Sequence, residues 1–129
     1  MKVLVTGANG QLGYDVVKEL QKQNIECYGA TRKDFDITDF RSTYTFIINY
    51  MPDAVIHCAA YTAVDKAEDE QGLCHLVNTS ATENIAEICK KINAKLLYTS
   101  TDYVFNGIKD GFYEVDDETN PINVYGKSK

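Results

Sequence analysis

Short apolar runs alternate with longer amphipathic segments along the chain. The runs at residues 3–5 (VLV), 54–59 (AVIHCA) and 95–99 (KLLYT) suit strands that are buried on both faces of a parallel sheet. Residues 25–30 form a weaker run of the same kind. The pattern therefore predicts four strands.

The segments between these runs carry apolar side chains on one helical face. We expect the second segment to begin at Thr38 or Asp39, since both are good N-cap residues, and to end before Pro52. The third can start upstream of Asn78. The three predicted helices include residues 12–20, 40–51 and 85–92.

The regular alternation of strands and helices predicts an α/β fold. The order β-α-β-α-β-α-β is typical of a Rossmann-type parallel sheet, in which right-handed crossovers place helices on both faces. Residues 106–124 are rich in Asn, Gly, Asp and Glu and are expected to form a long loop. No repeat or linker interrupts the chain, so we interpret residues 1–129 as one domain.

Composition and charge exclude several classes of function. The 129 residues include 13 Lys plus Arg and 19 Asp plus Glu, which gives a net charge of −6. This acidic balance argues against nucleic acid or an anionic membrane as the partner, and no apolar run reaches the ~18 residues of a membrane span. The four cysteines are too widely spaced for a zinc or redox pair, so we expect reduced core thiols and no metal. The first strand is too short to be a secretory signal, which favours a cytoplasmic location.

A glycine triplet between the first strand and the first helix predicts a phosphate-binding loop. Gly7, Gly10 and Gly13 lie in the string TGANGQLG. Gly7 can turn the chain off the strand, Gly10 leaves room for a pyrophosphate at its backbone, and Gly13 lets the helix pack closely against the sheet. The free N–H groups and the dipole at a helix start favour an anion. We therefore expect residues 1–129 to be an NAD(P)-binding domain.

The residues after the second strand bear on the choice of cofactor. A carboxylate about 20 residues beyond the loop would bind the ribose hydroxyls of NAD, but none occurs here before Asp34. Arg32 and Lys33 can instead contact a 2′-phosphate. The sequence favours NADPH, with NADH as the alternative.

Tyr125 and Lys129, at the end of the chain, are spaced as YxxxK. On a helix these positions share one face, and a lysine cation stabilises the phenolate form of a neighbouring tyrosine. Such a tyrosine can act as a general acid. Thr101 follows the last predicted strand, and ligands of parallel sheets bind beyond the carboxyl ends of strands. Thr101 and Tyr125 are thus candidate donors to a ketone oxygen that gains negative charge.

Four motifs, in this order along the chain, resemble those of the dTDP-4-dehydrorhamnose reductase family of the extended short-chain dehydrogenase/reductase superfamily. They are TGANGQLG, HCAAYTAVDKAED, STDYVFNG and NVYGKSK, and together they cover most of the chain. The glycine spacing and YxxxK are shared with the superfamily, whereas AAYTAVDKAE followed by STDYVF points to this reductase. The resemblance implies NAD(P)H-dependent reduction of the C4 ketone of dTDP-4-dehydro-L-rhamnose to dTDP-L-rhamnose, for bacterial surface polysaccharide.

The resemblance also implies roles for individual residues, with a nucleotide sugar as substrate and a homodimer in a full-length version. Thr101 would hydrogen-bond the substrate carbonyl, Tyr125 would donate the proton, and Lys129 would hold the nicotinamide ribose. Together with Arg32, the implied cofactor-binding residues are Gly7, Gly10, Gln11, Leu12, Gly13, Asp36, Ile37, Ala59, Ala60, Tyr61, Tyr125 and Lys129. The implied substrate-binding residues are Val64, Thr101, Asp102 and Tyr103.

Some polar and aromatic residues have a simpler structural interpretation. His57 and Tyr98 lie in apolar strands and are expected to be core residues, with the histidine satisfied by hydrogen bonds rather than acting as a base. The acidic residues 68–70 are expected to form a solvated helix face.

Two other functions stay open. A non-catalytic dinucleotide-binding or regulatory module would not need Thr101, Tyr125 and Lys129. An epimerase or dehydratase of the same superfamily is the second alternative, although a dehydratase would carry an acidic pair after the threonine, where Asp102 is followed by Tyr103. Family members are longer than this chain, so we expect a truncated and poorly active polypeptide without the C-terminal substrate-binding part.

Overall fold

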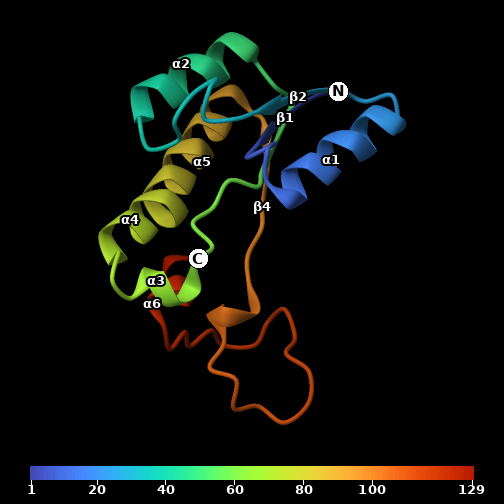
Figure 1. Cartoon of the computed structure of the whole chain (residues 1–129). Helices are drawn as coiled ribbons and strands as arrows, with labels where there is room; N and C mark the ends of the chain where they lie inside the picture. The colour runs from blue at the N-terminus through green and yellow to red at the C-terminus, as the bar shows by residue number, and fades with distance from the viewer.

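The computed structural model describes residues 1–129 and contains one parallel sheet of four strands in the order β2-β1-β3-β4. It confirms the predicted Rossmann-type fold (Figure 1). The third strand ends at His57 rather than Ala59, because its pairing with both neighbouring strands stops there. The strands are β1 (Lys2–Thr6), β2 (Glu26–Ala30), β3 (Ala54–His57) and β4 (Lys95–Tyr98).

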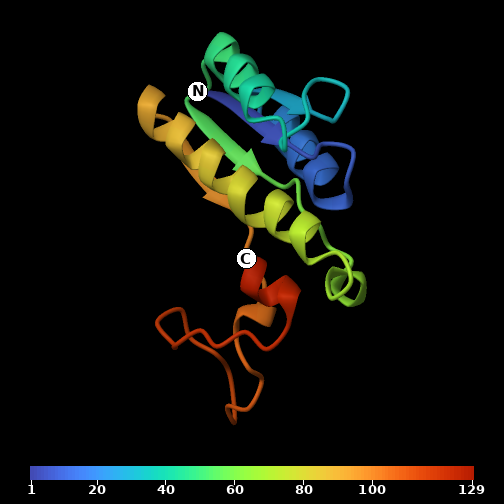
Figure 2. The same ribbon diagram turned by 90° about the vertical axis from the view of Figure 1, so that its left-hand side faces the viewer.

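Helices cover both faces of the sheet, as predicted (Figure 1, Figure 2). On one face α1 (Gln11–Lys22) packs against β1 and β2. On the other face α5 (Ala81–Ile92) packs against β3 and β4 and lies beside α2 (Phe40–Tyr50). The short helices are α3 (Val64–Ala67), α4 (Gln71–His75) and α6 (Val124–Ser128). None of these helices combines the length and the apolar character that crossing a membrane requires.

The main core lies between the sheet and the layer of α2 and α5. Leu4, Ile47, Val55 and Ile85 are completely buried in it. Each such side chain contributes about 1.5–3 kcal/mol when it leaves water. This layer therefore fixes the sheet and the positions at which its strands end.

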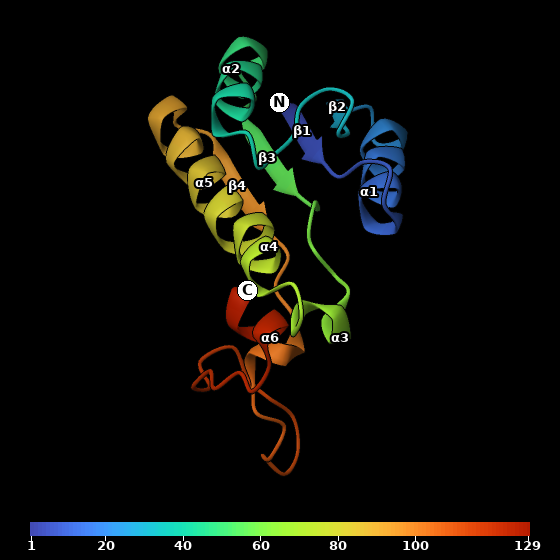
Figure 3. The same cartoon turned by 60° about the vertical axis from the view of Figure 1, so that its left-hand side comes forward.

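Beyond β4 the chain leaves the sheet. Residues 99–123 form a long loop, interrupted by a single 3₁₀ turn at Asp102–Val104, that extends away from the strands (Figure 3). Phe112 and Val115 on this loop are almost fully exposed. The loop that the composition predicts is thus confirmed, and no core of its own supports it.

The boundaries of α2 follow the sequence signals. Asp39 is the N-cap, and its carboxylate accepts hydrogen bonds from the backbone N–H groups of Arg41 and Ser42. At the other end Met51 adopts a left-handed conformation, which stops the helix before Pro52. The predicted start and end are both confirmed.

α4 and α5 form one continuous helical segment, joined by a π-helical turn at Leu76–Ser80. The segment therefore begins upstream of Asn78, as predicted, but the apolar spacing gives no sign of the π turn. The backbone carbonyl of Asn78 accepts hydrogen bonds from the hydroxyls of Thr82, at 2.7 Å, and Tyr98, at 3.3 Å. These side chains satisfy the backbone at the irregular turn.

All four cysteines are free thiols, as the spacing predicts. Cys74 and Cys89 are buried, whereas Cys27 and Cys58 are only partly buried. Cys58 is thus not the core residue that its apolar run suggests, because it lies just beyond the end of β3.

Candidate functional site

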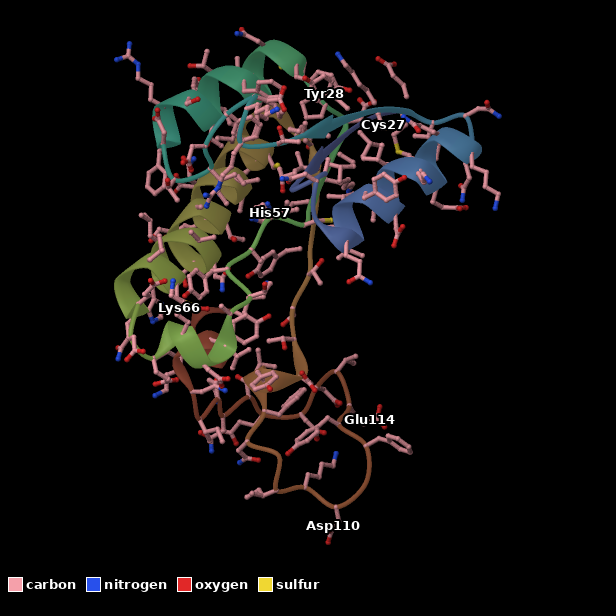
Figure 4. All side chains as sticks on the ribbon, in the orientation of Figure 1. Cys27, Tyr28, His57, Lys66, Asp110 and Glu114 are labelled. Carbon is pink, nitrogen blue, oxygen red and sulfur yellow. The ribbon has the colours of Figure 1, made fainter.

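The strand order reverses between β1 and β3, because β2 lies on one side of β1 while β3 and β4 lie on the other. The loops that leave the carboxyl ends of two such strands diverge and leave a crevice for a ligand. Here those loops are the glycine-rich segment after β1 and residues 58–63 after β3. Figure 4 shows His57 at the point where β3 gives way to the second of them.

The glycine loop is shaped by close contacts between backbones. Gly7 has φ +67°, and a Cβ there would lie 2.7 Å from the backbone nitrogen of Ala59. Only glycine therefore lets the two loops approach each other at this point. Gly10 is the N-cap of α1, and no side chain caps the helix start. The N–H groups of that first turn are free to bind an anion.

Gly13, the third glycine of the loop, does not make the predicted close contact between the helix and the sheet. A Cβ on Gly13 would lie 2.3 Å from the carbonyl oxygen of Gly7, so Gly13 lets α1 pack against the loop itself. The close packing of α1 against the sheet occurs at Gly29 of β2, where a Cβ would lie 2.9 Å from the side chain of Val17. The sequence reasoning missed Gly29, although a glycine within a strand is a signal of close approach.

A cleft of about 770 Å³ runs along the carboxyl ends of the strands. This volume lies within the range of cofactor sites. The predicted site residues that line the cleft are Gly7, Gly10, Gln11, Leu12, Gly13, Arg32, Ile37, Ala59, Ala60, Tyr125 and Lys129. The lining residues that the prediction missed are Thr6, Asn9, Asp15, Ala30, Thr31, Phe35, His57, Cys58, Thr62, Val77, Thr99 and Ser100. Most of the missed residues directly follow a strand or end one, which is the signal that could have identified them.

At the β2 end of the cleft, a cation lines the wall but the two nearby carboxylates, Asp34 and Asp36, do not. Arg32 lines the cleft. Asp34 does not line the cleft, and its carboxylate accepts hydrogen bonds from the Tyr28 hydroxyl at 2.6 Å and the Thr31 backbone N–H at 2.8 Å. These two bonds hold the pKa of Asp34 below its usual value. Asp36 does not line the cleft, since its carboxylate accepts hydrogen bonds from the backbone and hydroxyl of Thr38.

At the other end of the cleft, Tyr125 and Lys129 both line the wall. The Lys129 ammonium lies 4.3 Å from the centre of the Tyr98 ring, over its face. Burial lowers the pKa of Lys129. The Tyr103 ring meets the Tyr125 ring edge-on at 5.6 Å. The structure therefore places both members of the YxxxK pair in the cleft that also contains the glycine loop.

The start of α6 is held by residues distant in sequence. The Glu68 carboxylate accepts a hydrogen bond from the Val124 backbone N–H at 2.8 Å, and Asn123 caps Gly126 at 2.7 Å. A Cβ on Gly126 would lie 2.1 Å from the carbonyl oxygen of Tyr103, so a glycine is needed for the close approach. Glu68 is exposed, as expected for a solvated face, but its carboxylate also bonds the backbone of α6.

The end of α6 is held by the π-helical turn. The buried Asn78 amide donates to the Ser128 hydroxyl at 2.9 Å and to the Tyr61 carbonyl at 3.0 Å. Its oxygen accepts from the Tyr61 backbone N–H at 2.8 Å. The Thr79 hydroxyl donates to the Ser128 carbonyl at 2.7 Å. Sequence reasoning assigned no role to Asn78, because nothing in the apolar pattern marks a polar residue at the centre of the molecule.

Tyr61, predicted on the nicotinamide side, does not line the cleft. Its hydroxyl donates to the Glu70 carboxylate at 2.7 Å. Desolvation together with this hydrogen bond raises the pKa of Tyr61 to about 12. Glu70 is therefore a partner of Tyr61 and of Lys66, 2.8 Å away, and not the purely solvated residue that was expected.

The predicted substrate residues lie beside the cleft rather than in its wall. Thr101 caps the 3₁₀ turn: its hydroxyl donates to the Asp102 carboxylate at 3.1 Å and accepts from the Tyr103 N–H at 3.3 Å. None of these three residues lines the cleft, and neither does Val64. The ring contact between Tyr103 and Tyr125 nevertheless brings this turn next to the tyrosine.

Comparison with known families matches residues 1–129 to the family described as RmlD substrate binding domain. The dTDP-4-dehydrorhamnose reductase of Mycolicibacterium smegmatis is 42% identical over 129 residues, which cover 99% of this chain and 39% of that protein. A solved dTDP-4-dehydrorhamnose reductase from Clostridium acetobutylicum has a TM-score of 0.96 and 40% identity, over 99% of this chain and 46% of that one. The Bacillus anthracis enzyme in complex with NADP has a TM-score of 0.94 and 40% identity, over 98% and 45%. The chain spans less than half the length of these relatives.

Proposed function

Because the chain belongs to the RmlD substrate binding domain family, we propose that residues 1–129 form the NAD(P)-binding domain of a nucleotide-sugar reductase. The reaction is the reduction of the C4 ketone of dTDP-4-dehydro-L-rhamnose to dTDP-L-rhamnose. One observation carries the proposal: the glycine loop and the YxxxK pair line the same cleft, one at each end.

The glycine loop fits a dinucleotide. Its glycines let backbone segments pack together where a Cβ would not fit, at Gly7 against Ala59 and at Gly13 against Gly7. The first turn of α1 offers uncapped N–H groups. These groups would bind the pyrophosphate. The cleft is lined both by Arg32, after β2, and by Lys129, after α6, which suits a ligand with two different ends.

The reduction divides between the cofactor and the chain. A bound NADPH would supply the hydride, which is chemistry that no side chain offers. Tyr125 would donate the proton to the ketone oxygen. Thr101 would add a second hydrogen bond as that oxygen gains negative charge, once its hydroxyl, which donates to Asp102 in the structure, turns towards the cleft. Lys129 holds the ribose and stabilises the phenolate that Tyr125 becomes.

The β2 end of the cleft favours NADPH over NADH. The Asp34 carboxylate is occupied by Tyr28 and Thr31, so it does not present itself to ribose hydroxyls. Arg32 faces the cleft as a fork of donors suited to a 2′-phosphate. The relative from Bacillus anthracis was solved with NADP.

Calorimetric titration of the 129-residue chain with NADPH and then NADH tests the proposal. We expect NADPH to bind at least about tenfold more tightly, which corresponds to about 1.4 kcal/mol. In Arg32→Ala the two affinities should become nearly equal, whereas Arg41→Ala, the matched change at the exposed arginine of α2, should leave the difference intact. Absence of binding to either nucleotide would refute the proposal, and equal affinities would refute the role of Arg32.

Catalysis is tested separately from binding. With dTDP-4-dehydro-L-rhamnose and NADPH, we expect slow oxidation of NADPH by this chain and a further drop of about 10²–10⁴ in rate for Tyr125→Phe. A purely regulatory module would show no turnover and no effect of Tyr125→Phe. The homodimer of a full-length version and the cytoplasmic location stay predictions.

A further inference from the structure

The Lys129 ammonium is a partly buried charge without an anionic partner. The residue lines the cleft, yet it takes part in none of the ion pairs of the structure. Burial lowers the pKa of Lys129. Because a cation that leaves water costs free energy unless another group compensates for it, this charge calls for an explanation.

The ring of Tyr98 provides that compensation. The Lys129 ammonium lies 4.3 Å from the ring centre, over the face of the ring. The face of an aromatic ring carries partial negative charge and attracts a cation at this distance. Tyr98 ends β4 and does not itself line the cleft. It therefore holds the lysine without occupying space that a ligand would need.

The Tyr98 ring is itself held in place by the sheet and by the π-helical turn. Its hydroxyl donates to the Asn78 carbonyl at 3.3 Å, and the ring stacks on His57, its register partner in β3, at 5.7 Å. These contacts fix the ring although Tyr98 is only partly buried, and not the core residue that its apolar strand suggests.

His57, beside this ring, is anchored on one edge. It is 1% exposed, and its Nδ1 lies 2.6 Å from the Thr6 hydroxyl. Its Nε2 is buried and has no partner, so the expectation of a histidine satisfied by hydrogen bonds is only half met.

Both rings of this stack are neutral at neutral pH. Burial, with a smaller contribution from the Lys129 cation, lowers the pKa of His57 to about 4. Burial also raises the pKa of Tyr98, which keeps the phenol protonated. The stack therefore neither repels the ammonium nor forms an ion pair with it.

A neutral ring leaves more to the lysine than a carboxylate would. A carboxylate would neutralise the charge and occupy N–H donors of the ammonium. A ring face attracts the cation and leaves its full charge in place. That charge is what a phenolate form of Tyr125 requires, and the N–H groups are what ligand oxygens require.

We propose that Tyr98 is a positioning residue of this site, whose ring holds the Lys129 ammonium at the cleft wall for the nicotinamide ribose without neutralising it. This inference rests on the proposed function, because it takes the dinucleotide as the ligand of Lys129. A lysine that is ordered before binding loses less entropy when the ligand arrives. The ring should thus raise the affinity for the half of the dinucleotide that Lys129 contacts.

The test compares a whole ligand with half of it. NADPH contains the nicotinamide riboside, whereas adenosine 2′,5′-bisphosphate keeps the adenosine and the 2′-phosphate but lacks that half. Both are titrated calorimetrically into the wild-type chain, Tyr98→Phe and Tyr98→Leu. Phenylalanine keeps the ring and loses the hydroxyl, whereas leucine loses both. Tyr44→Leu is the matched control, because the Lys91 ammonium lies 4.7 Å from the centre of that ring, which does not line the cleft.

We expect Tyr98→Leu to weaken NADPH binding about three- to tenfold, in keeping with one cation–π contact, and to leave the bisphosphate unchanged. Tyr98→Phe and Tyr44→Leu should bind both ligands like the wild type. Equal weakening of both ligands by Tyr98→Leu would overturn the inference, because Tyr98 would then act on the shape of the cleft. Unchanged NADPH binding in Tyr98→Leu, or an equal loss in Tyr98→Phe, would also overturn it.

A double-mutant cycle asks whether the ring acts through the lysine. In a Lys129→Met background, Tyr98→Leu should cause no further loss of NADPH affinity, since the cation is gone. A loss as large as in the wild-type background would assign Tyr98 a purely structural role and contradict the proposal.

A measurement on the wild-type chain covers the case in which Tyr98→Leu does not fold. The ε-methylene protons of Lys129 should resonate upfield of those of Lys127, in the same helix, because they lie over a ring. NADPH but not the bisphosphate should change that shift. If the wild type binds both ligands but the Lys129 protons show no upfield shift or no response to NADPH, the proposed function stands and only this inference fails. If the wild type binds neither ligand, the proposed function fails first.

Discussion

The two ends of the cleft are built in different ways. The end formed by β1, β2 and α1 consists of neighbours in sequence, joined by a loop whose glycines permit close backbone contacts. The end formed by α6 is a helix of five residues at the far side of a long loop. A helix this short does not hold its shape alone. Its order comes from Glu68 at one end and from the π-helical turn at the other.

Because of this difference, the sheet can stay folded while part of the site is disordered. The sheet shares its core with α2 and α5, so its opening requires global unfolding. α6 rests on a small cluster, Ala67, Cys74 and Val124, and on a few hydrogen bonds. Segments with few buried contacts open locally at lower free energy than the core. The end of the cleft formed by α6, here called the tyrosine end, can therefore lose its structure while the end formed by β1, β2 and α1 stays folded.

The largest effect is expected from Gly13→Ala, which breaks the sturdier end. The new Cβ would lie 2.3 Å from the Gly7 carbonyl oxygen, so the loop must shift. We expect a loss of roughly 2–3 kcal/mol in the free energy of unfolding and NADPH binding weakened by about tenfold or more. Thermal unfolding and calorimetry measure both. Gly72→Ala is the control, because nothing lies within 4 Å of its Cβ position, and a stable Gly13→Ala that binds normally would contradict the role of the loop.

Acid should weaken the sheet through His57. Its pKa is about 4 in the folded chain against 6.5 when unfolded, because burial disfavours the charged ring. The unfolded chain thus takes up the proton first as the pH falls below 6.5, and stability is lost until about pH 4. Between pH 7.5 and pH 5 this amounts to roughly 2 kcal/mol. Denaturant unfolding should show this slope in the wild type and in His75→Gln but not in His57→Gln, and an unchanged slope in His57→Gln would assign the acid effect elsewhere.

Gly126→Ala should act on the weaker end alone. Its Cβ would lie 2.1 Å from the Tyr103 carbonyl oxygen, which forces α6 away from the 3₁₀ turn. We expect a local loss of about 1–2 kcal/mol, seen as hydrogen exchange about tenfold faster or more in residues 124–128, with protection of β1–β4 unchanged. The midpoint of thermal unfolding should scarcely move. Uniform loss of protection throughout the sheet would show that the two ends form one cooperative unit.

The smallest effect is expected from Glu68→Gln. The amide still accepts the hydrogen bond of the Val124 N–H but without the carboxylate charge. The loss should be about 0.5–1 kcal/mol, again confined to exchange in α6. Asp69→Asn, at the exposed neighbour whose carboxylate forms no hydrogen bond or ion pair in the structure, should change nothing. Equal effects of the two variants would show that Glu68 acts only through its negative charge and not through its hydrogen bond to Val124.

The sequence predicts the sheet well because its signals are local. Apolar runs mark the strands, Asp39 marks the start of α2, and the glycine loop lies where the order β-α predicts it. The crossover rule predicts a parallel sheet with helices on both faces, whereas the strand order and the switch between β1 and β3 come from the structure. For the same reason the three glycines, Gln11 and Leu12 were identified, although Thr6, Asn9 and Asp15 beside them were missed.

The tyrosine end is predicted less well because its structure depends on distant contacts. Nothing near Val124 in the sequence shows that Glu68 accepts its N–H, and nothing near Ser128 points to Asn78. Tyr61 illustrates the opposite error: it follows β3 as expected, but its side chain bonds Glu70 instead of facing the cleft. Which way a side chain points after a strand ends is decided by packing, which a single sequence does not display.

The π-helical turn at Leu76–Ser80 has a consequence for anyone who would redesign this chain. Engineering for stability favours ideal backbones, and the obvious step here is to remove one residue so that α4 and α5 become a regular helix. That deletion would rotate Asn78 and Thr79 away from Ser128. The more regular protein would then unfold at a higher temperature, and yet Tyr125 would no longer be held in an ordered position. Here an irregular stretch of helix is a feature that a designer should leave untouched.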